Sequence, residues 1–424
     1  MEKIAINIKR LIHNLDSLGK IGCNRNGGID RALGSRADYK ARQWILDYWS
    51  NILGLEVHID SIGNLWGMRN SGSSLPPIVI GSHHDAVPNG GHYDGALGVL
   101  AATEIMQTYQ EQEILTEHPL YLVSFTGEEP NPYNVSTLGS KVLSGRLTTE
   151  DLQKLTHHDT GAPFSECLEE IGGCLAETKT AKLTSKDIGA FIELHIEQGK
   201  RLYEHQDSTA IVTCITGIYR ENITIHGTAN HGGTTNMPDR HDALLTACEL
   251  NLAFESLLLE ENDKETVGTI GFMEVFPNAV SIIPDKVQLT LEIRTCQPEK
   301  RKRILEKLTA VCEEISERRG TTIERTLNLD QKEMPMSPLI QSALKEAMIH
   351  QNVPVHEYVS MAGHDAANIA RFTESGMIFT QSVNGKSHCA DEYSKPETIE
   401  ETVNVLAEAI PILDKEMNAH AAVI

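Results

Sequence analysis

Hydrophobic and polar positions in the first half of the chain follow two periods, one typical of buried strands and one of amphipathic helices. The run from Pro77 to Gly81 is short, apolar and β-branched, as in a buried parallel strand, and Gly95 to Thr108 has helical spacing. The same patterns predict a helix over 38–53 and strands over 55–60, 119–125 and 190–195. This order predicts an α/β domain with a helix-covered sheet.

A different order of elements begins near Thr213. The pattern predicts a strand over 221–226, a helix over 242–259, strands over 266–275 and 287–294, a helix over 298–318 and a strand over 322–328. This β-α-β-β-α-β order is that of the ferredoxin-like unit. The third strand alternates apolar and polar side chains from Val287 to Arg294, so helices should bury one of its faces.

Beyond Pro335 the chain returns to long helices and one apolar strand, Gly376 to Gln381. We therefore expect the C-terminal segment to complete the first domain, and the ferredoxin-like unit to be inserted into it. The predicted division is a first domain built from 1–212 and 331–424 and an inserted domain over 213–330, with hinges near 212 and 330. A length of 424 residues suits two domains.

Composition narrows the class of protein. Hydrophobic residues make up 40% of the chain and charged residues 23%, which predicts a globular protein. No apolar run reaches membrane-spanning length, and the N-terminal residues lack the apolar centre of a signal peptide, so we expect a cytoplasmic protein. The formal charge of −22 disfavours nucleic acid and membranes as partners. Eight cysteines without CxxC spacing predict buried free thiols.

A glycine-rich turn with chemically active side chains follows the Pro77 strand. From Gly81 to Leu100 it reads GSHHDAVPNGGHYDGALGVL. Polar residues also stand at the ends of three other predicted strands, and the four clusters are His83/Asp85/Asp94, Glu128-Glu129, His195 and His388. Because loops at the carboxyl ends of strands in an open α/β sheet converge, we expect these clusters to form one site.

The residue types in these clusters predict a metal centre. Three histidines with Asp94 and a glutamate make a set of nitrogen and oxygen ligands without thiolate, which suits Zn²⁺, Mn²⁺ or Co²⁺. Five protein ligands are too many for one catalytic zinc. They fit two cations about 3.5–4 Å apart that share a carboxylate.

For two pairs of neighbouring residues, His83-His84 and Glu128-Glu129, the sequence pattern does not decide which member binds metal. Alternation at a strand end sends His83 and Asp85 to one side and His84 to the other, so that Asp85 can accept the outer N–H of His83. The reverse, with His84 as the ligand and His83 packed in the core, satisfies the same pattern. Glu128 and Glu129 should point apart, so that one binds metal while the other acts as a base toward a metal-activated water.

Nine segments resemble a single family of amidohydrolases and keep its order. They read GSHHDAV, GGHYDGALGVL, FTGEEPNPYNVSTLGS, ELHIEQG, HGTANHGGTTNMPDRHDAL, PNAVSIIPDKV, LEIR, AGHDA and SHCADEYS. The family comprises N-carbamoyl-L-amino acid hydrolases, allantoate and ureidoglycolate amidohydrolases and β-ureidopropionases, within the aminoacylase-like and carboxypeptidase-like di-metal peptidases. The resemblance runs from about Ile6 to the last helix. It implies a di-metal aminopeptidase-like catalytic domain with a mixed sheet and an inserted ferredoxin-like dimerisation and lid domain.

The resemblance assigns a ligand set position by position. It implies that His83 and His195 hold one metal, that Glu129 and His388 hold the other, and that Asp94 bridges both. It also favours the first histidine of the His-His pair as the ligand.

Catalytic and substrate residues follow from the same resemblance. Glu128 is the implied general base, and Asp85 orients its histidine. His231 matches the family's histidine that reaches a partner subunit's active site and polarises the scissile carbonyl; a surface histidine is the alternative. Residues implied to bind the substrate are Gln198, Asn278, Arg294 and His364. For the arginine, whose guanidinium offers a bidentate fork to a carboxylate, a structural ion pair is the alternative.

Position 195 carries information on the substrate. A histidine there matches the carbamoyl-hydrolase branch, whereas peptidase-type relatives usually have a carboxylate, which favours a ureido substrate. Two segments depart from the more frequent family pattern: Glu128-Glu-Pro130 in place of EEG, and Asn131-Pro-Tyr-Asn134 in place of Arg-Phe-Gly. Both belong to a loop that we expect to shape the pocket, and neither removes an implied ligand.

Together these features predict a homodimeric, metal-dependent hydrolase of a linear amide C–N bond in an N-carbamoyl acid. The products from an N-carbamoyl amino acid would be the amino acid, ammonia and carbon dioxide. An aminoacylase or dipeptidase on the same fold is the alternative. A ligand-binding protein without activity is a more remote one, because such a chain should have lost Glu128 or a ligand.

Overall fold

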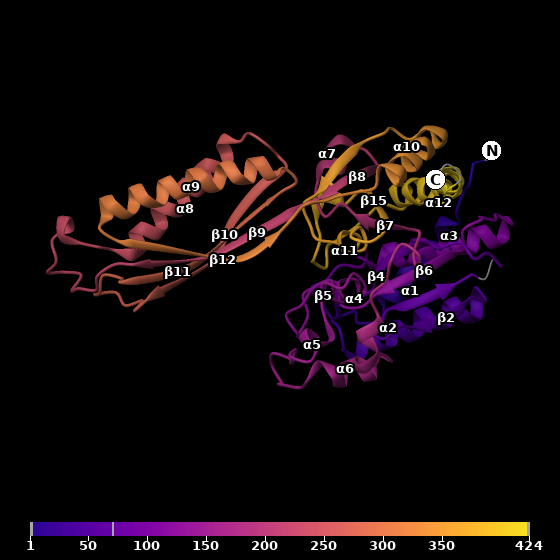
Figure 1. Cartoon of the computed structure of the whole chain (residues 1–424), viewed down its shortest axis with the longest axis horizontal. Coiled ribbons are helices and arrows are strands. Elements are labelled where there is room, and N and C mark those ends of the chain that lie inside the picture. The colour runs from indigo at the N-terminus through magenta and orange to yellow at the C-terminus, as the bar shows by residue number, and fades with distance from the viewer. Residues whose placement is uncertain (1–2, 70–71, 422–424) are drawn as a thin grey trace. The chain divides into compact units, whose positions relative to one another are not determined.

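The structure, a computed structural model, describes residues 3–69 and 72–421. The chain divides into two units (Figure 1): unit 1 combines Met1–Thr213 with Met336–Ile424, and unit 2 is Cys214–Pro335. The sequence predicted the second boundary near 330. In the structure the inserted segment continues to Pro335, past β12 (Thr322–Gln331) and to the end of the short strand β13 (Met334–Pro335).

A mixed sheet of nine strands forms the centre of unit 1. Its order is β13-β8-β15-β7-β4-β6-β3-β2, and β14 also pairs with β8. The four inner strands are parallel: β15 (Glu374–Thr380), β7 (Ala190–Ile196), β4 (Ile78–His83) and β6 (Leu120–Phe125). Antiparallel strands flank them, namely β8 (Thr209–Ile215), β3 (Leu65–Met68) and β2 (Glu56–Ile59), and β14 (Glu357–Ser360) pairs with β8.

The register of the parallel strands aligns their carboxyl ends. His83 at the end of β4 pairs with Phe125 at the end of β6, and His195 of β7 pairs with Phe379 near the end of β15. Side chains at these ends, and in the loops that follow, therefore emerge at a common edge of the sheet.

Helices bury one side of this sheet in the largest apolar core of the described residues. Ile78 and Ile80 of β4 and Ile192 of β7 belong to it. The surrounding helices are α1 (Ile8–Gly19), α2 (Arg36–Asp47), α3 (Ala96–Glu111), α10 (Pro338–Gln351) and α12 (Pro396–Ala421). The helix predicted over 38–53 ends at Asp47 and continues as a π-helical turn, Tyr48–Ile52.

Shorter elements complete unit 1. A separate apolar cluster forms around α4 (Leu138–Leu143), α5 (Thr149–Leu152) and α6 (Phe164–Glu170). Helix α11 (Ala366–Ile369) packs on β7 and β15, and α7 (Arg201–His205) follows β7 in the chain. A two-stranded sheet pairs β1 (Ile29–Arg31) with β5 (Ala86–Gly90).

Unit 2 is a four-stranded antiparallel sheet with two helices. Its elements are β9 (Gly217–His226), α8 (Ala243–Glu260), β10 (Thr266–Phe276), β11 (Lys286–Thr295), α9 (Pro298–Arg319) and β12, and the strand order is β10-β11-β9-β12. Along β11 the residues Val287, Leu289, Leu291 and Ile293 are buried in a core shared with both helices. This is the predicted ferredoxin-like arrangement, and the predicted fold class is confirmed.

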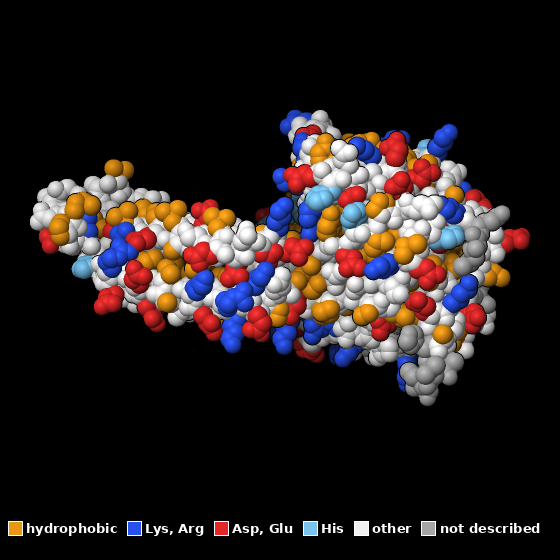
Figure 2. All heavy atoms as spheres, turned by 90° about the horizontal axis from the view of Figure 1, so that it is seen from above, with side chains coloured by type: hydrophobic (Ala, Val, Ile, Leu, Met, Phe, Trp, Pro, Cys, Tyr) orange, Lys and Arg blue, Asp and Glu red, His pale blue; other side chains and the backbone are white. Residues whose placement is uncertain are grey.

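The face of the molecule seen in Figure 2 mixes acidic, basic and apolar side chains. Within the described residues no helix combines the length and hydropathy needed to cross a bilayer. All eight cysteines are free thiols. The expectation that they are buried is wrong for Cys23 and Cys248, which are exposed in a loop and on α8.

Candidate metal and catalytic centre

Four parallel strands deliver the predicted cluster residues to one edge of the unit 1 sheet. His83 ends β4 and His195 lies near the end of β7. Glu128 and Glu129 follow β6, and His388 follows β15. The predicted convergence of distant segments is therefore what the structure shows.

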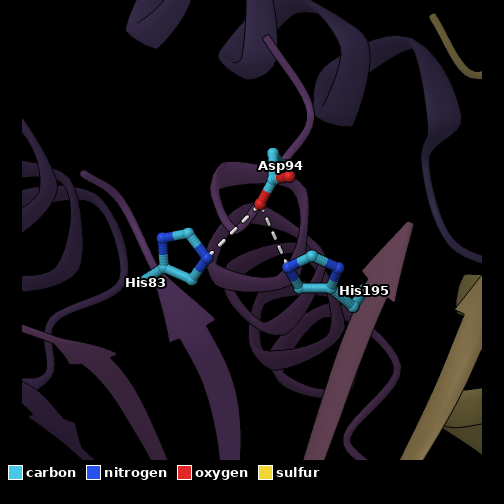
Figure 3. Close-up of side chains that lie close together, drawn as sticks. All are labelled: His83, Asp94 and His195. Atoms are coloured by element: carbon cyan, nitrogen blue, oxygen red, sulfur yellow. Dashed lines mark ion pairs between the residues drawn. The ribbon is translucent and has the colours of Figure 1, made fainter. Parts of the chain in front are cut away.

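The first group of side chains surrounds one oxygen of Asp94 (Figure 3). Asp94 Oδ1 lies 3.5 Å from His83 Nε2 and 3.2 Å from His195 Nε2. Each ring places its other nitrogen against a backbone carbonyl: His83 Nδ1 is 3.1 Å from the Asp85 oxygen, and His195 Nδ1 is 2.9 Å from the Ile196 oxygen. When Nδ1–H donates to a carbonyl, Nε2 of a neutral ring carries a lone pair. In both rings this lone pair faces Asp94.

The second group surrounds the other oxygen of Asp94. His388 Nε2 lies 3.4 Å from Asp94 Oδ2 and 3.4 Å from Glu129 Oε1. Within each group the potential ligand atoms lie within 4.8 Å of one another. The two oxygens of one carboxylate thus face two separate sets of ligand atoms.

These residues fit a pair of divalent cations. His83 Nε2 is buried and has no hydrogen-bond partner among the described residues, which is costly for a polar atom unless something binds it. All the donor atoms are imidazole nitrogens or carboxylate oxygens, the ligands preferred by Zn²⁺, Mn²⁺ and Co²⁺. A carboxylate shared by both groups matches a dinuclear site.

Glycine at position 95 allows His83 to lie where it does. Gly95 begins α3 with a φ of 62°, and a Cβ there would come within 2.3 Å of the His83 ring. Both the left-handed backbone and the lack of space favour glycine here.

Burial and charge shift the acid–base properties of the cluster. Burial opposes the charged form of Asp94, but His195, His388 and His83 outweigh it and hold the pKa of Asp94 well below its usual range. Burial and Asp94 raise the pKa of Glu129 to about 7. The hydrogen bond with Asp94 raises the pKa of His388 to about 9. The site concentrates negative charge, which bound cations would neutralise.

Glu128 lies beside the first group. Its Oε2 is 3.6 Å from His83 Nε2, and burial raises the pKa of Glu128 well above its usual value. A carboxyl group in this position is suited to accept and release a proton.

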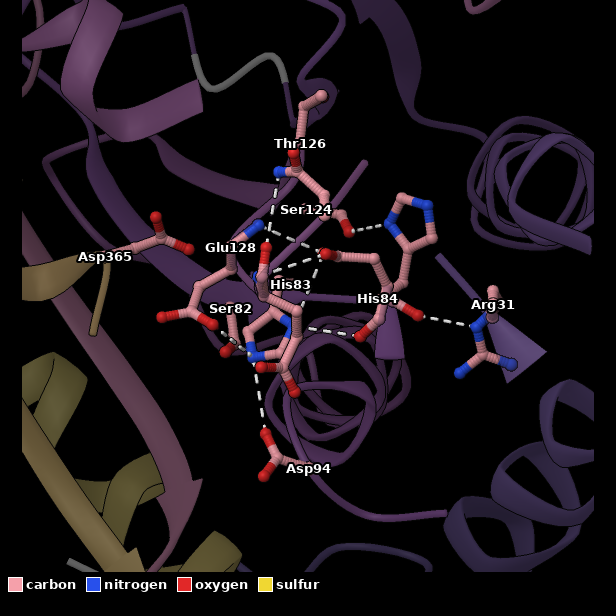
Figure 4. Close-up of polar contacts among 12 residues, drawn as sticks. Arg31, Ser82, His83, His84, Asp94, Ser124, Thr126, Glu128 and Asp365 are labelled. Atoms are coloured by element: carbon pink, nitrogen blue, oxygen red, sulfur yellow. Dashed lines mark hydrogen bonds and ion pairs between the residues drawn. The ribbon is translucent and has the colours of Figure 1, made fainter. Parts of the chain in front are cut away.

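The carboxylate of Asp85 does more than the sequence indicated. It binds the loop of Glu128, the residue that lies beside His83 in Figure 4. We expected it to accept the N–H of His83, but His83 Nδ1 is nearer to the Asp85 backbone oxygen than to Asp85 Oδ1, at 3.1 Å against 3.5 Å. The two carboxylate oxygens accept the backbone N–H groups of Glu128 and Glu129 at 3.2 and 3.1 Å. Asp85 therefore positions the loop that carries both glutamates.

His84 points away from the cluster. Its Nδ1 lies 2.6 Å from Ser124 Oγ and its Nε2 lies 2.8 Å from Asp38 Oδ1, so both ring nitrogens are engaged. Burial lowers the pKa of His84. His83, and not His84, is the residue that the structure brings to Asp94.

Two residues expected to bind substrate also lie in this cluster. Gln198 Nε2 donates to Asp94 Oδ2 at 2.7 Å, while its buried Oε1 has no hydrogen-bond partner among the described residues. His364 is buried; its Nε2 is 2.8 Å from Ser360 Oγ and its ring centroid is 4.5 Å from that of His195.

The other three predicted residues belong to unit 2. His231 is exposed, and its Nδ1 accepts the N–H groups of Gly233 and Thr234 at 3.0 and 3.2 Å. Asn278 is exposed with a φ of 56°. Arg294 Nε lies 2.7 Å from Glu292 Oε1, so the ion pair considered as its alternative is present.

Sequence reasoning missed Glu392 and Ser387. Glu392 is 4% exposed and accepts backbone N–H groups of Tyr93 and Asp94, and Ser387 Oγ donates to Asp94 Oδ2. Both lie in the SHCADEYS segment that contains His388. That proximity was the available signal.

Comparison with known proteins identifies the family of this chain. A model of peptidase family M20/M25/M40 matches residues 79–411. The chain is 34% identical to an N-carbamoyl-L-amino-acid amidohydrolase of Pseudomonas sp. (strain NS671), over 97% of this chain and 99% of the relative. It is 32% identical to a ureidoglycolate hydrolase of Oryza sativa subsp. japonica, over 94% and 83% respectively.

A solved structure is also similar over nearly the whole chain. It is an amidase of the hydantoinase/carbamoylase family from Burkholderia multivorans, with a TM-score of 0.89, 31% identity and coverage of 97% of this chain and 98% of that one. The fold, the ligand groups and these matches agree. The chain therefore belongs to peptidase family M20/M25/M40 and is an amidohydrolase, a hydrolase of carbon–nitrogen bonds.

Proposed function

We propose that this protein is a metal-dependent hydrolase that cleaves the linear amide C–N bond of an N-carbamoyl (ureido) acid. Candidate substrates are an N-carbamoyl-L-amino acid, allantoate or ureidoglycolate, with release of ammonia and carbon dioxide. The observation that carries the proposal is the buried Glu128 beside two ligand groups that share Asp94. The names of the relatives support a ureido substrate.

His83 and His195 would hold one cation, Glu129 and His388 the other, and Asp94 would contribute one oxygen to each. Zn²⁺ and Mn²⁺ are the first candidates and Co²⁺ a further one. When bound, such cations lower the pKa of water and polarise a carbonyl oxygen.

Glu128 supplies the acid–base chemistry. Its carboxylate takes the proton from the attacking water and then gives it to the leaving nitrogen, which departs as an amine or ammonia. Burial of Glu128 favours this double role because it raises the pKa of the carboxyl group well above its usual value. Asp85 keeps the carboxylate in place through the backbone N–H of Glu128.

Polar groups of both units are suited to recognise the ends of a ureido acid. The free Oε1 of Gln198 can accept an N–H of the ureido group. Arg294 and Asn278 would bind the substrate carboxylate, with the arginine offering two parallel donors. His364, next to His195, would line the ureido end.

His231 would donate a hydrogen bond to the carbonyl oxygen in the active site of a partner subunit. Because its Nδ1 accepts two backbone N–H groups, the ring proton is on Nε2, which makes that atom a donor. A donor of this kind stabilises negative charge on the oxygen by about 3–4 kcal/mol.

The proposal includes a homodimer formed through unit 2, which would act as dimerisation domain and lid. A groove of about 720 Å³ runs between α8 and the edge strand β10, lined by Leu252, Leu259 and Val267 among others. These three side chains are 67%, 72% and 44% exposed, and a group of exposed apolar side chains of this kind is typical of a surface that binds another protein.

We also propose a cytoplasmic location. The free state of all eight cysteines supports this location, and cell fractionation tests it.

An ammonia-release screen tests the activity. The purified protein is loaded with Mn²⁺ or Zn²⁺ and offered allantoate, ureidoglycolate, β-ureidopropionate and several N-carbamoyl-L-amino acids. N-acetyl amino acids and dipeptides, followed by amine release, test the aminoacylase and dipeptidase alternative. Turnover of a ureido acid supports the proposal, whereas turnover of acyl compounds alone contradicts it.

Glu128→Gln is the decisive variant in that screen. It should lower kcat by about 10²–10⁴-fold, the usual contribution of a general base, with metal content unchanged. Glu150→Gln, at an exposed glutamate of α5, is the matched control and should keep full activity. Full activity of Glu128→Gln would overturn the assignment of the base.

A further inference from the structure

Glu392 binds the backbone that carries the shared carboxylate. Its Oε1 accepts the N–H of Tyr93 at 2.8 Å and the N–H of Asp94 at 3.0 Å. The two segments are about three hundred residues apart in the chain, and the Glu392 side chain is buried. Hydrogen bonds from two adjacent amides to one carboxylate oxygen fix both the position and the orientation of the peptide.

A second contact ties Glu392 to the side chain of Asp94. Ser387 Oγ lies 2.8 Å from Asp94 Oδ2 and 3.2 Å from Glu392 Oε2. Glu392 thus holds the backbone of Asp94 directly, and it lies beside the Ser387 hydroxyl, whose single proton is donated to the Asp94 carboxylate at the shorter of the two distances. Rotation of the Asp94 carboxylate would break the hydroxyl contact, and a shift of the turn would break the amide contacts.

Gly91 leaves the space that Glu392 occupies. A Cβ at this position would lie 2.0 Å from Cδ and from Oε1 of Glu392, far inside contact distance. Gly91 does not have a left-handed φ, and the three atoms nearest to such a Cβ all belong to the Glu392 carboxylate.

We propose that Glu392 is a positioning residue for the metal centre: it fixes Asp94 so that Oδ1 faces His83 and His195 while Oδ2 faces Glu129 and His388. The proposal rests on the proposed function, since it takes Asp94 to be the shared ligand. It extends that function to a residue that touches neither the substrate nor the metals. Loss of Glu392 should weaken both cation sites together, because both depend on the same carboxylate.

Titration calorimetry of the full-length, chelator-treated protein with Mn²⁺ tests this role. Glu392→Ala should weaken Mn²⁺ binding by about 10–100-fold, the usual effect of removing a residue that orients a metal ligand. Glu392→Gln keeps an oxygen that can accept both N–H groups and should bind Mn²⁺ within a few-fold of the wild type. Glu401→Gln, an exposed glutamate of α12, is the control and should leave binding unchanged.

A second readout separates positioning from general stability. The melting temperature in the presence of chelator should differ little between Glu392→Gln and the wild type, while the rise in melting temperature on adding Mn²⁺ should be smaller in Glu392→Ala. Wild-type Mn²⁺ affinity in Glu392→Ala would overturn the proposal.

Gly91→Ala tests the same contact without touching the glutamate. It should weaken Mn²⁺ binding like Glu392→Ala, and it should have no further effect in the double variant, because both changes remove one interaction. Additive effects would overturn the proposal, and this test stands even if Glu392→Ala does not fold. Failure of the wild-type protein to bind Mn²⁺ saturably would instead refute the proposed metal centre itself.

Discussion

Asp85 accepts the backbone N–H of Glu128 at 3.2 Å through Oδ1, and its other oxygen accepts that of Glu129 at 3.1 Å. One aspartate from the end of β4 therefore holds the loop after β6 in register. Because the same carboxylate fixes both amides, the position of the proposed base, Glu128, is linked to that of the proposed metal ligand, Glu129. This gives Asp85 a role distinct from that of a partner for His83.

Replacement of Asp85 by asparagine tests this role. An asparagine has only one acceptor oxygen, so one of the two N–H groups would face an NH₂ group and the loop would shift. We expect kcat to fall by about 10–100-fold while the far-ultraviolet circular dichroism is unchanged. Asp159→Asn, at an exposed loop position, serves as the control. A variant with wild-type kcat would mean that the loop keeps its geometry without Asp85.

Asp38 predicts how stability depends on acid. This buried carboxylate pairs with Arg42 at 3.0 Å and with His84 at 2.8 Å. Burial alone would raise its pKa, but these partners, Arg42 first, lower it from 3.8 to about 2. A group with a lowered pKa in the folded state stabilises the protein above the unfolded pKa, and this contribution is lost as pH falls through the folded pKa.

The free energy of unfolding should therefore lose about 2 kcal/mol from Asp38 between about pH 4 and pH 2. Urea unfolding at successive pH values measures this slope. Asp38→Asn cannot titrate, so its stability should fall less steeply than that of the wild type over the same interval, although it starts lower. Parallel slopes for the two proteins would contradict the assignment.

The parts of the fold that the sequence predicts best are its buried strands. The strands that end at the site are continuous apolar runs such as Ile78–Ile80, and buried strands give that signal directly. The sequence does not predict strand β8, because this strand runs through the predicted hinge near 212, where the order of elements changes. The pattern of residues could not show that one strand continues across it.

At the site too, the sequence predicts features that depend on the local pattern but not the contacts between distant segments. Alternation at the end of β4 indicated that His83 and His84 face opposite sides but not which of them faces the site, and the fold brings His83 to Asp94. Alternation could not tell which donors Asp85 would meet, because those amides belong to the loop that follows another strand, β6. Glu392 was invisible for the same reason: a carboxylate that binds backbone N–H groups requires no particular residue type in its partner.

Arg294 offers a test of substrate recognition. Its guanidinium already contacts Glu292 through Nε, and Glu292 also pairs with Arg220, so these residues form a small charged cluster on unit 2. If Arg294 binds the substrate carboxylate through two donors, Arg294→Lys should raise KM for an N-carbamoyl amino acid by about 10–100-fold. The KM for the corresponding carboxamide, which lacks the charge, should change little. Equal changes in KM for both compounds would indicate that Arg294 does not bind the carboxylate and that its ion pair with Glu292 is only structural.

The proposed dimer makes a prediction that involves two inactive variants. In a hybrid of a Glu128→Gln subunit with a His231→Ala subunit, one active site has an intact Glu128 and would receive an intact His231 from the partner. If His231 acts across the dimer, mixing and reassembling the two variants should restore about a quarter of wild-type activity, because half of the dimers are hybrids with one working site. If His231 acts within its own subunit, every mixture stays inactive.

The apolar face of α8 tests the dimer itself. Leu252→Glu combined with Leu259→Glu places two charges on side chains that are 67% and 72% exposed, which should cost little in the folding of one subunit. Charges buried against a second copy would oppose association, so sedimentation should show a monomer, and activity should fall with it. Leu115→Glu, at a 79% exposed residue of unit 1, is the matched control and should remain dimeric and active. An active monomer would refute both the interface and the action of His231 across it.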